Sequence, residues 1–227
     1  LGKLGITKPK CLLKINKLTL LENIILNLKK RRVKEISIIL GYKSEMIVDK
    51  LKKFKKIKFN LIKINNYKKN GHACSWHAFK NVWIKKKKPI LLMHTDIFFD
   101  PVYLDNIIKS PKKNIIGIHS NKNFFKKKSF LVRTNRKSQI KEINYNHKIK
   151  KPIGEVIGIN KISESSASDI FNFMDKFLIK KNKRLSWEIM LDKYIKKTND
   201  TLFVLRSQNF LWKNINLKSD FLSINKN

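Results

Sequence analysis

The chain has 227 residues, a length that suits one α/β domain with a single core. Its hydrophobic fraction of 42% excludes an intrinsically disordered chain, and no apolar run reaches the roughly 18 residues that cross a membrane. Lys and Arg total 52 against 16 Asp and Glu, a net charge of +36 that attracts anions. The two cysteines form no CxxC pair and no signal peptide is evident, so we expect a cytoplasmic protein.

The positive charge consists almost entirely of lysine. Only six basic residues are arginines, although recognition of nucleic acid usually favours the planar guanidinium. The lysines are spread along the chain, and Lys, Ile, Asn and Phe are abundant together, as an AT-rich coding sequence would produce. We therefore expect nucleotides as partners, with a basic nucleic-acid-binding module as the alternative from another class.

Helix and strand signals alternate through the first half of the chain. Thr19 and Glu22 have capping-box spacing ahead of an apolar helical face. Gly41 ends a short β-branched segment, and Ser44 is expected to cap the next helix. The expected helices cover 20–28, 44–54 and 73–84, and the expected strands cover 35–40, 59–64 and 89–93. Such alternation requires crossover connections and predicts a parallel sheet.

The second half begins in the same way and then changes. Pro101 is expected at the first position of a helix, where its missing amide costs nothing. Alternating residues with turn signals predict antiparallel strands between Phe130 and Lys148. Further strands are expected at 114–119, 155–159 and 202–205, and helices at 101–108, 166–179 and 186–195. The predicted fold is a Rossmann-like three-layer α/β/α domain over 1–227, with a mostly parallel mixed sheet and a small antiparallel β insertion.

Asp96 is the first candidate for chemistry. It lies three residues beyond the apolar run Ile90–Met93, at the carboxyl end of a predicted strand, where open α/β sheets bind ligands. A carboxylate there can hold Mg²⁺ on a triphosphate, because Mg²⁺ takes few protein oxygens and completes its shell with phosphate and water. By position alone, Asp96 could equally be a solvated helix cap.

Several motifs in order resemble the nucleotidyltransferases that activate sugar 1-phosphates, phosphocholine and phosphonates. That family has a G-x-G-x-R-L loop, then P-K-x-L, then G-Y after a strand, and later G-D-x-x-F. The matching segments here are Leu1-Gly2, Pro9-Lys10-Cys11-Leu12, Gly41-Tyr42 and Thr95-Asp96-Ile97-Phe98. Asn65–Ser75 resembles a loop of the cytidylyltransferase branch, and Gly154-Glu155-Val156-Ile157-Gly158 and Trp212–Asn216 resemble later family segments.

The resemblance implies a reaction and roles for particular residues. Nucleoside monophosphate, CMP from CTP, is transferred to a small phosphorylated alcohol or phosphonate such as phosphocholine or 2-aminoethylphosphonate, and pyrophosphate is released. Lys10 would neutralise phosphates, Asp96 and Asn216 would hold Mg²⁺, and Glu155 would contact the acceptor. The implied nucleotide-binding residues are Leu1, Gly2, Asn65, Ser75 and Thr95. Alternatives are a sugar-1-phosphate nucleotidyltransferase, a non-catalytic nucleotide-binding relative and, for Glu155, a plain salt-bridge role.

Three departures from the family pattern affect the expected activity. The first strand and the glycine-rich loop with its Arg are absent, which we interpret as truncation of the chain. Thr95 replaces the usual Gly before the metal-binding Asp, and Asn216 replaces the second metal carboxylate. Asp220 matches a family Asp that belongs to the terminal helix rather than to the metal. Truncation explains the missing loop but does not explain Asn216.

Overall fold

The computed structural model describes residues 3–121, 125, 129–145, 148–178, 184–207 and 210–225, in two compact units. Unit 1 combines Leu1–Tyr67, His94–Phe99 and Leu211–Asn227, and unit 2 combines Lys68–Met93 with Asp100–Phe210. Leu1 and Gly2 lie outside the described residues. The expected single domain over 1–227 stays a prediction. Within the described part of the chain, no helix is long and apolar enough to cross a membrane.

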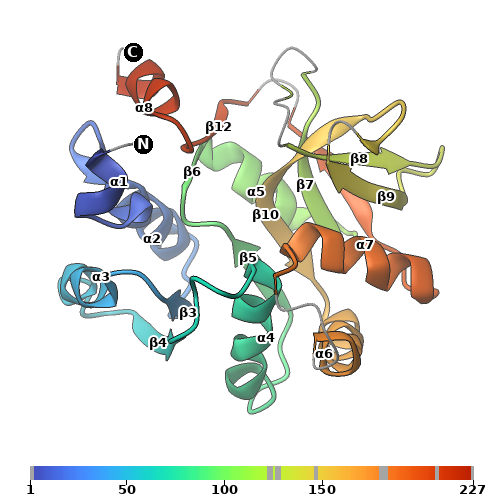
Figure 1. The fold of residues 1–227 in the computed structure, drawn as a ribbon, viewed down its shortest axis with the longest axis horizontal. Coiled ribbons are helices and arrows are strands. Elements are labelled where there is room, and N and C mark those ends of the chain that lie inside the picture. The colour runs from blue at the N-terminus through green and yellow to red at the C-terminus, as the bar shows by residue number, and fades with distance from the viewer. Residues whose placement is uncertain are drawn as a thin grey trace. The chain divides into compact units, whose positions relative to one another are not determined.

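Unit 1 is a mixed α/β unit (Figure 1). Its helices are α1 (Lys3–Thr7), α2 (Leu20–Lys30), α3 (Ser44–Leu51) and α8 (Lys218–Asn225), with a 3-10 turn at Lys10–Leu12. Its strands are β1 (Lys14–Ile15), β2 (Leu18–Thr19), β3 (Glu35–Leu40), β4 (Lys58–Lys63), β6 (Ile97–Phe99) and β12 (Trp212–Asn214). The pair β3–β4 is parallel, whereas β1–β2 and β6–β12 are antiparallel. The apolar faces of α2 and α3 share one core with β3.

The two predicted helix starts in unit 1 had different outcomes. The capping box of α2 is confirmed, since the Glu22 amide donates to Thr19 Oγ1 at 3.2 Å and the Thr19 amide donates to Glu22 Oε2 at 2.7 Å. The predicted cap at Ser44 is wrong, because Lys43 precedes the first helical residue and provides no side-chain cap. Lys43 has a left-handed φ of 47°, and its ammonium donates to the Thr7 carbonyl at 2.9 Å. The helix start is therefore fixed by a contact that is distant in sequence.

Glu22 makes the stability of unit 1 depend on pH. Burial of this 4% exposed side chain raises its pKa, but the hydrogen bonds from Lys53 and Thr19 and the charge of Lys50 outweigh burial and lower the pKa to about 2. Because the carboxyl pKa is lower in the folded protein, ionised Glu22 stabilises the fold at pH values above about 4.5, its unfolded pKa. This stability is lost as the pH falls through about 2. We expect this carboxyl to contribute about 2 kcal/mol at pH 6, after allowing for solvent screening of the exposed lysines.

The measurement is urea unfolding between pH 6 and pH 2 for the natural chain and for Glu22→Gln. Gln can still form the capping box but does not titrate, so the substituted chain should lose less stability over this interval. Equal losses in the two proteins would contradict the assignment.

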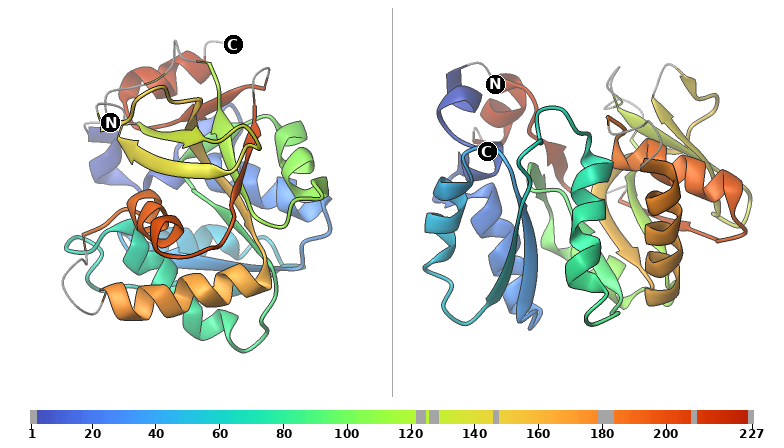
Figure 2. Two further views of the ribbon diagram at one scale, coloured as in Figure 1. Left: turned by 90° about the vertical axis from the view of Figure 1, so that its right-hand side faces the viewer. Right: turned by 60° about the horizontal axis from the view of Figure 1, so that its bottom comes forward.

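Unit 2 contains the larger sheet and the longest helices (Figures 1 and 2). Its helices are α4 (His72–Trp83), α5 (Pro101–Lys109), α6 (Glu164–Leu178) and α7 (Trp187–Lys197). Its strands are β5 (Ile90–Met93), β7 (Ile115–His119), β8 (Phe130–Thr134), β9 (Ile140–Tyr145), β10 (Gly154–Ile162) and β11 (Phe203–Arg206). Pro101 occupies the first turn of α5 as predicted, and the Asp100 carboxylate caps the Val102 amide at 2.9 Å.

The sheet of unit 2 corrects the expected strand directions. The strands β5, β7 and β11 run the same way, as the helix–strand alternation predicted, but β10 lies between β5 and β7 and is antiparallel to both. The β8–β9 pair is the predicted antiparallel element, and β8 also pairs with β10. Among the described strand pairs only β3–β4 and β7–β11 are parallel, so the expected mostly parallel sheet is wrong. The expectation fails because β10, a nine-residue strand from later in the chain, lies between β5 and β7.

The core of unit 2 is aromatic. Helices α4, α6 and α7 pack together on one face of the sheet, where Trp76 lies with its ring centroid 4.6 Å from that of Trp187 and 5.5 Å from that of Phe171. On the opposite face Tyr103 of α5 approaches Gly117 so closely that a Cβ there would lie 3.1 Å from its hydroxyl. Both faces of β7 are therefore covered, which accounts for the burial of all five of its residues.

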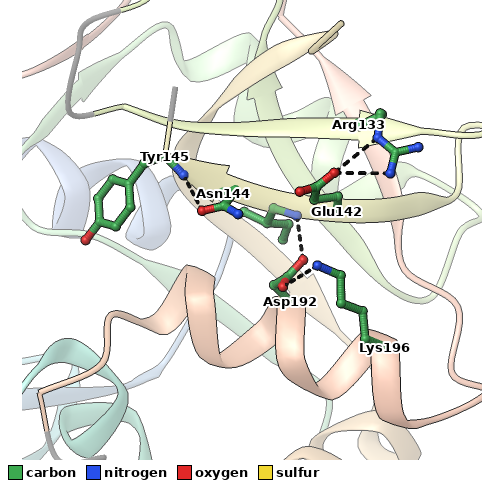
Figure 3. A network of polar contacts seen from close by, with 7 residues as sticks. Arg133, Glu142, Asn144, Tyr145, Asp192 and Lys196 are labelled. Carbon is green, nitrogen blue, oxygen red and sulfur yellow. Dashed lines mark hydrogen bonds and ion pairs between the residues drawn. The ribbon is translucent and has the colours of Figure 1, made fainter. Parts of the chain in front are cut away.

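A buried carboxylate fastens α7 to β9 (Figure 3). Asp192 Oδ1 accepts the Ile143 amide at 2.9 Å, and Oδ2 accepts the Lys196 ammonium at 2.8 Å. On the far side of the same strand, Glu142 pairs with Arg133 of β8 at 3.1 Å, where the arginine is largely solvated. Since β9 ends the sheet path, Asp192 satisfies an amide that has no strand beside it.

Candidate functional site

Three distant segments of unit 1 bring Lys10, Asp96 and Asn216 together. Lys10 Nζ donates to Asn216 Oδ1 at 2.8 Å and lies 3.7 Å from Asp96 Oδ2. The side chains of Lys10 and Asp96 are 43% and 27% exposed, so solvent and a ligand can reach both. The three residues to which the sequence assigned phosphate and metal binding therefore form one accessible cluster.

The antiparallel pair β6–β12 sets the spacing between Asp96 and Asn216. Ile97 is opposite Asn214 in this ladder, and the Ile215 amide donates to the Asp96 carbonyl at 2.9 Å. Ile215 is fully buried in a small core with Leu13 and Leu20, which anchors this end of the ladder. Asp96 and Asn216 thus lie at the same end of the β6–β12 pair, and the packing of Ile215 holds that end in place.

Lys10 is presented by the 3-10 turn that follows Pro9. The Leu12 amide donates to the Pro9 carbonyl at 2.9 Å, and Cys11 and Leu12 turn into the core, so that Lys10 points outward. Burial raises the pKa of the Cys11 thiol to about 12. Cys11 therefore stays protonated and is a packing residue beside the cluster, not a nucleophile.

Asp220 is a supporting residue whose role in the cluster the sequence did not reveal. It lies in α8, as its family counterpart implied, and is 5% exposed. Its Oδ2 accepts hydrogen bonds from the backbone amides of Asn216 at 3.0 Å and Leu217 at 2.8 Å. An Asp in the first turn of a helix is a common capping signal, but its target could not be read from spacing alone. Asp220 fixes the backbone that carries Asn216.

The oxygen donors of the cluster fit a magnesium ion. Asp96 and Asn216 already share one cation, the Lys10 ammonium, and both offer the hard oxygen ligands that Mg²⁺ prefers. Among the described residues no group of three His, Cys, Asp or Glu side chains could hold a metal by itself. Asp96 and Asn216 could therefore provide only part of the ligand shell of such an ion.

The other predicted site residues are divided between the units. In unit 1, Asn65 and Thr95 are both exposed, in the segments that follow β4 and β5. In unit 2, Ser75 is half-buried in the first turns of α4. At the start of that helix, the Ala73 backbone amide donates a hydrogen bond to the Leu185 carbonyl at 3.2 Å. The structure thus joins Lys10, Asp96 and Asn216 by direct contacts and gives no such contact for Asn65, Ser75 or Thr95.

Glu155 belongs to a buried polar cluster in unit 2. It is 7% exposed on β10 and lies directly opposite His119 of β7. His119 Nδ1 lies 3.1 Å from the Ser207 carbonyl; burial lowers the histidine pKa and this contact partly offsets the effect. The sequence did not identify His119 or Ser207, although both stand at the carboxyl ends of strands. A side chain this buried is not an ordinary surface salt-bridge partner, which was the alternative role considered for Glu155.

Comparison with known proteins supports the fold. No protein-family model matches the sequence, and no curated protein sequence matches it significantly. Among solved structures, the CTP:phosphocholine cytidylyltransferase of Streptococcus pneumoniae has a TM-score of 0.78 at 17% identity, over 100% of this chain and 92% of that one. The inositol-1-phosphate CTP transferase of T. maritima has a TM-score of 0.78 at 16% identity, over 96% and 87%. A UDP-glucose pyrophosphorylase has 0.79 at 13%, over 99% and 92%.

These likenesses establish that the chain has the fold of nucleotidyltransferases. They span nearly the whole chain and nearly the whole of each similar structure. Enzymes named for cytidylyl transfer and for sugar nucleotides occur among them at similar scores, so the fold does not distinguish the substrates.

Proposed function

We propose that the protein is a nucleotidyltransferase that transfers CMP from CTP to a small phosphorylated alcohol or a phosphonate and releases pyrophosphate. The observation that carries the proposal is the contact of Lys10 with both Asp96 and Asn216. Among the residues implied by the family resemblance, these three come from segments up to 206 residues apart in sequence and lie in one accessible cluster. The nucleotidyltransferase fold supports the same reaction class.

The chemistry required is charge neutralisation. An acceptor oxygen attacks the α-phosphorus, a new P–O bond forms, and the bond to the leaving pyrophosphate breaks. Asp96 and Asn216 would hold Mg²⁺, which when bound neutralises phosphate charge. Lys10, on an exposed stem beside them, would pair with the phosphate oxygens as the two anions meet. Buried Glu155 would orient a cationic acceptor group in unit 2, where a carboxylate is shielded from water.

The acceptor class separates the leading proposal from a second candidate. CTP is favoured by the resemblance of Asn65–Ser75 to the cytidylyltransferase branch, and Glu155 suits the cationic nitrogen group of phosphocholine or 2-aminoethylphosphonate. A sugar-1-phosphate nucleotidyltransferase is the second candidate, because the fold matches a UDP-glucose pyrophosphorylase equally well.

Pyrophosphate release tests the proposal directly. The full chain is incubated with Mg²⁺ and each of CTP, UTP, GTP and ATP, against phosphocholine, 2-aminoethylphosphonate and glucose 1-phosphate. We expect release with CTP and an acceptor that carries a cationic nitrogen group, and the CMP conjugate in the product by mass spectrometry. A preference for UTP with the hexose phosphate would replace the first candidate with the second, and no release with any pair would contradict both.

A further inference from the structure

Lys10 stands in the position that a metal shared by Asp96 and Asn216 would need. Its ammonium lies 2.8 Å from the Asn216 amide oxygen and 3.7 Å from the Asp96 carboxylate. Asp96 and Asn216 could therefore hold a metal together only if the Lys10 ammonium moved away. The cluster already contains a cation, and that cation belongs to the chain.

Asn216 is held in place as the partner of this lysine. The Asp220 carboxylate accepts hydrogen bonds from the backbone amides of Asn216 and Leu217. The backbone amide of Ile215 donates to the Asp96 carbonyl. The backbone on both sides of Asn216 is thus fixed, and its side-chain oxygen is aimed at Lys10. Asn216 is itself exposed, so these backbone contacts, and not burial, hold its side chain beside Lys10.

The charges of the cluster favour a metal that arrives with phosphate. Lys10 and Asp96 carry opposite charges and Asn216 is neutral, so their sum gives little attraction for a bare divalent ion. A metal–triphosphate complex is different, because its oxygens complete the metal shell and its negative charge gives the displaced ammonium a new partner.

On the basis of the proposed function, we infer that Asn216 positions Lys10 as the resident cation of the site, so that a divalent metal binds together with the nucleotide and not before it. Asn216 is then a positioning residue that acts through Lys10. Substitution of either Lys10 or Asn216 should then allow the metal to bind without the nucleotide.

The test compares binding of Mn²⁺ alone with binding of Mn²⁺ and CTP, by calorimetry and by the paramagnetic resonance signal of free Mn²⁺. Lys10→Met should tighten Mn²⁺ alone by about tenfold, because the competing ammonium is gone, and should weaken Mn²⁺ with CTP by about tenfold, because a phosphate partner is lost. Asn216→Asp should tighten Mn²⁺ alone by a similar factor. Lys17→Met, which removes an exposed lysine from the same unit, controls for the loss of one positive charge.

The opposite signs for Lys10→Met distinguish this role from a structural one, since a misfolded variant weakens both forms of binding. Circular dichroism of each variant checks the fold. The inference is overturned if the natural chain binds Mn²⁺ alone as tightly as Asn216→Asp, or if Lys10→Met leaves Mn²⁺ binding unchanged. If no pyrophosphate is released but the Mn²⁺ ranking holds, the proposed reaction fails while the role of Asn216 stands.

Discussion

Asp96→Asn is expected to lower pyrophosphate release by at least about a hundredfold, the usual cost of removing one group that stabilises transition-state charge. The substitution keeps the shape of the side chain but removes its charge, and the Asp96 carbonyl still accepts the Ile215 amide. The fold should therefore be unchanged, and the loss should appear in turnover rather than in yield of folded protein. The measurement is the initial rate of pyrophosphate release with CTP and the acceptor that supports release in the assay described under the proposed function.

Asp49→Asn provides the matched control for Asp96. Asp49 is an exposed carboxylate of α3 in the same unit, and its Oδ1 lies 2.9 Å from the ammonium of Lys52, the residue just after the helix. Its removal should leave the rate within about twofold, because exposed ion pairs contribute little. If Asp96→Asn is as active as the control, Asp96 is only a solvated polar residue and the proposed reaction is wrong.

Asp192→Ala should cost unit 2 about 2–3 kcal/mol of stability, because it leaves a buried amide without an acceptor. The Ile143 amide and Lys196 both lose their partner, and the edge of β9 loses its attachment to α7 (Figure 3). The midpoint of thermal unfolding should fall by roughly 5–10 °C. Hydrogen exchange of the Ile143 amide gives the local measurement, and this amide should lose its protection.

Glu142→Ala is the control, because Glu142 is the neighbour of Ile143 on β9 and also takes part in an ion pair. Glu142 pairs with Arg133, whose side chain is 46% exposed, so its loss should cost less than about 1 kcal/mol. Equal destabilisation by the two substitutions would show that the Asp192 contact contributes no more than an exposed ion pair.

Local signals in the sequence predicted most elements but not their order in space. The capping box of Thr19 and Glu22 spans three residues, and the helix that follows carries its own apolar face, so both could be predicted without the rest of the chain. By contrast, β10 lies between β5 and β7, which precede it by dozens of residues. No local period records which strand will be a neighbour, and the expected sheet was wrong for that reason.

The same difference between local signals and contacts of distant segments applies to the candidate site. Asp96 stands out because it follows a strong apolar run, and the resemblance to a family gave Lys10 and Asn216 their places. The strands that join them, β6 and β12, have three residues each, too few to give a periodic signal. The backbone support from Asp220 and the contact of His119 with Ser207 depend on packing between distant segments, which spacing does not encode.

The discontinuity of unit 1 has a consequence during synthesis. Lys10 is made early, whereas Asn216 follows 206 residues later, after all of unit 2 has been translated. At ordinary rates of roughly 5–20 residues per second, the ribosome leaves Lys10 without this partner for roughly 10–40 s. The last strand of unit 1 pairs with β6 only after that interval. A nascent chain can therefore fold its first helices early but acquires the Lys10–Asn216 contact only near the end of translation.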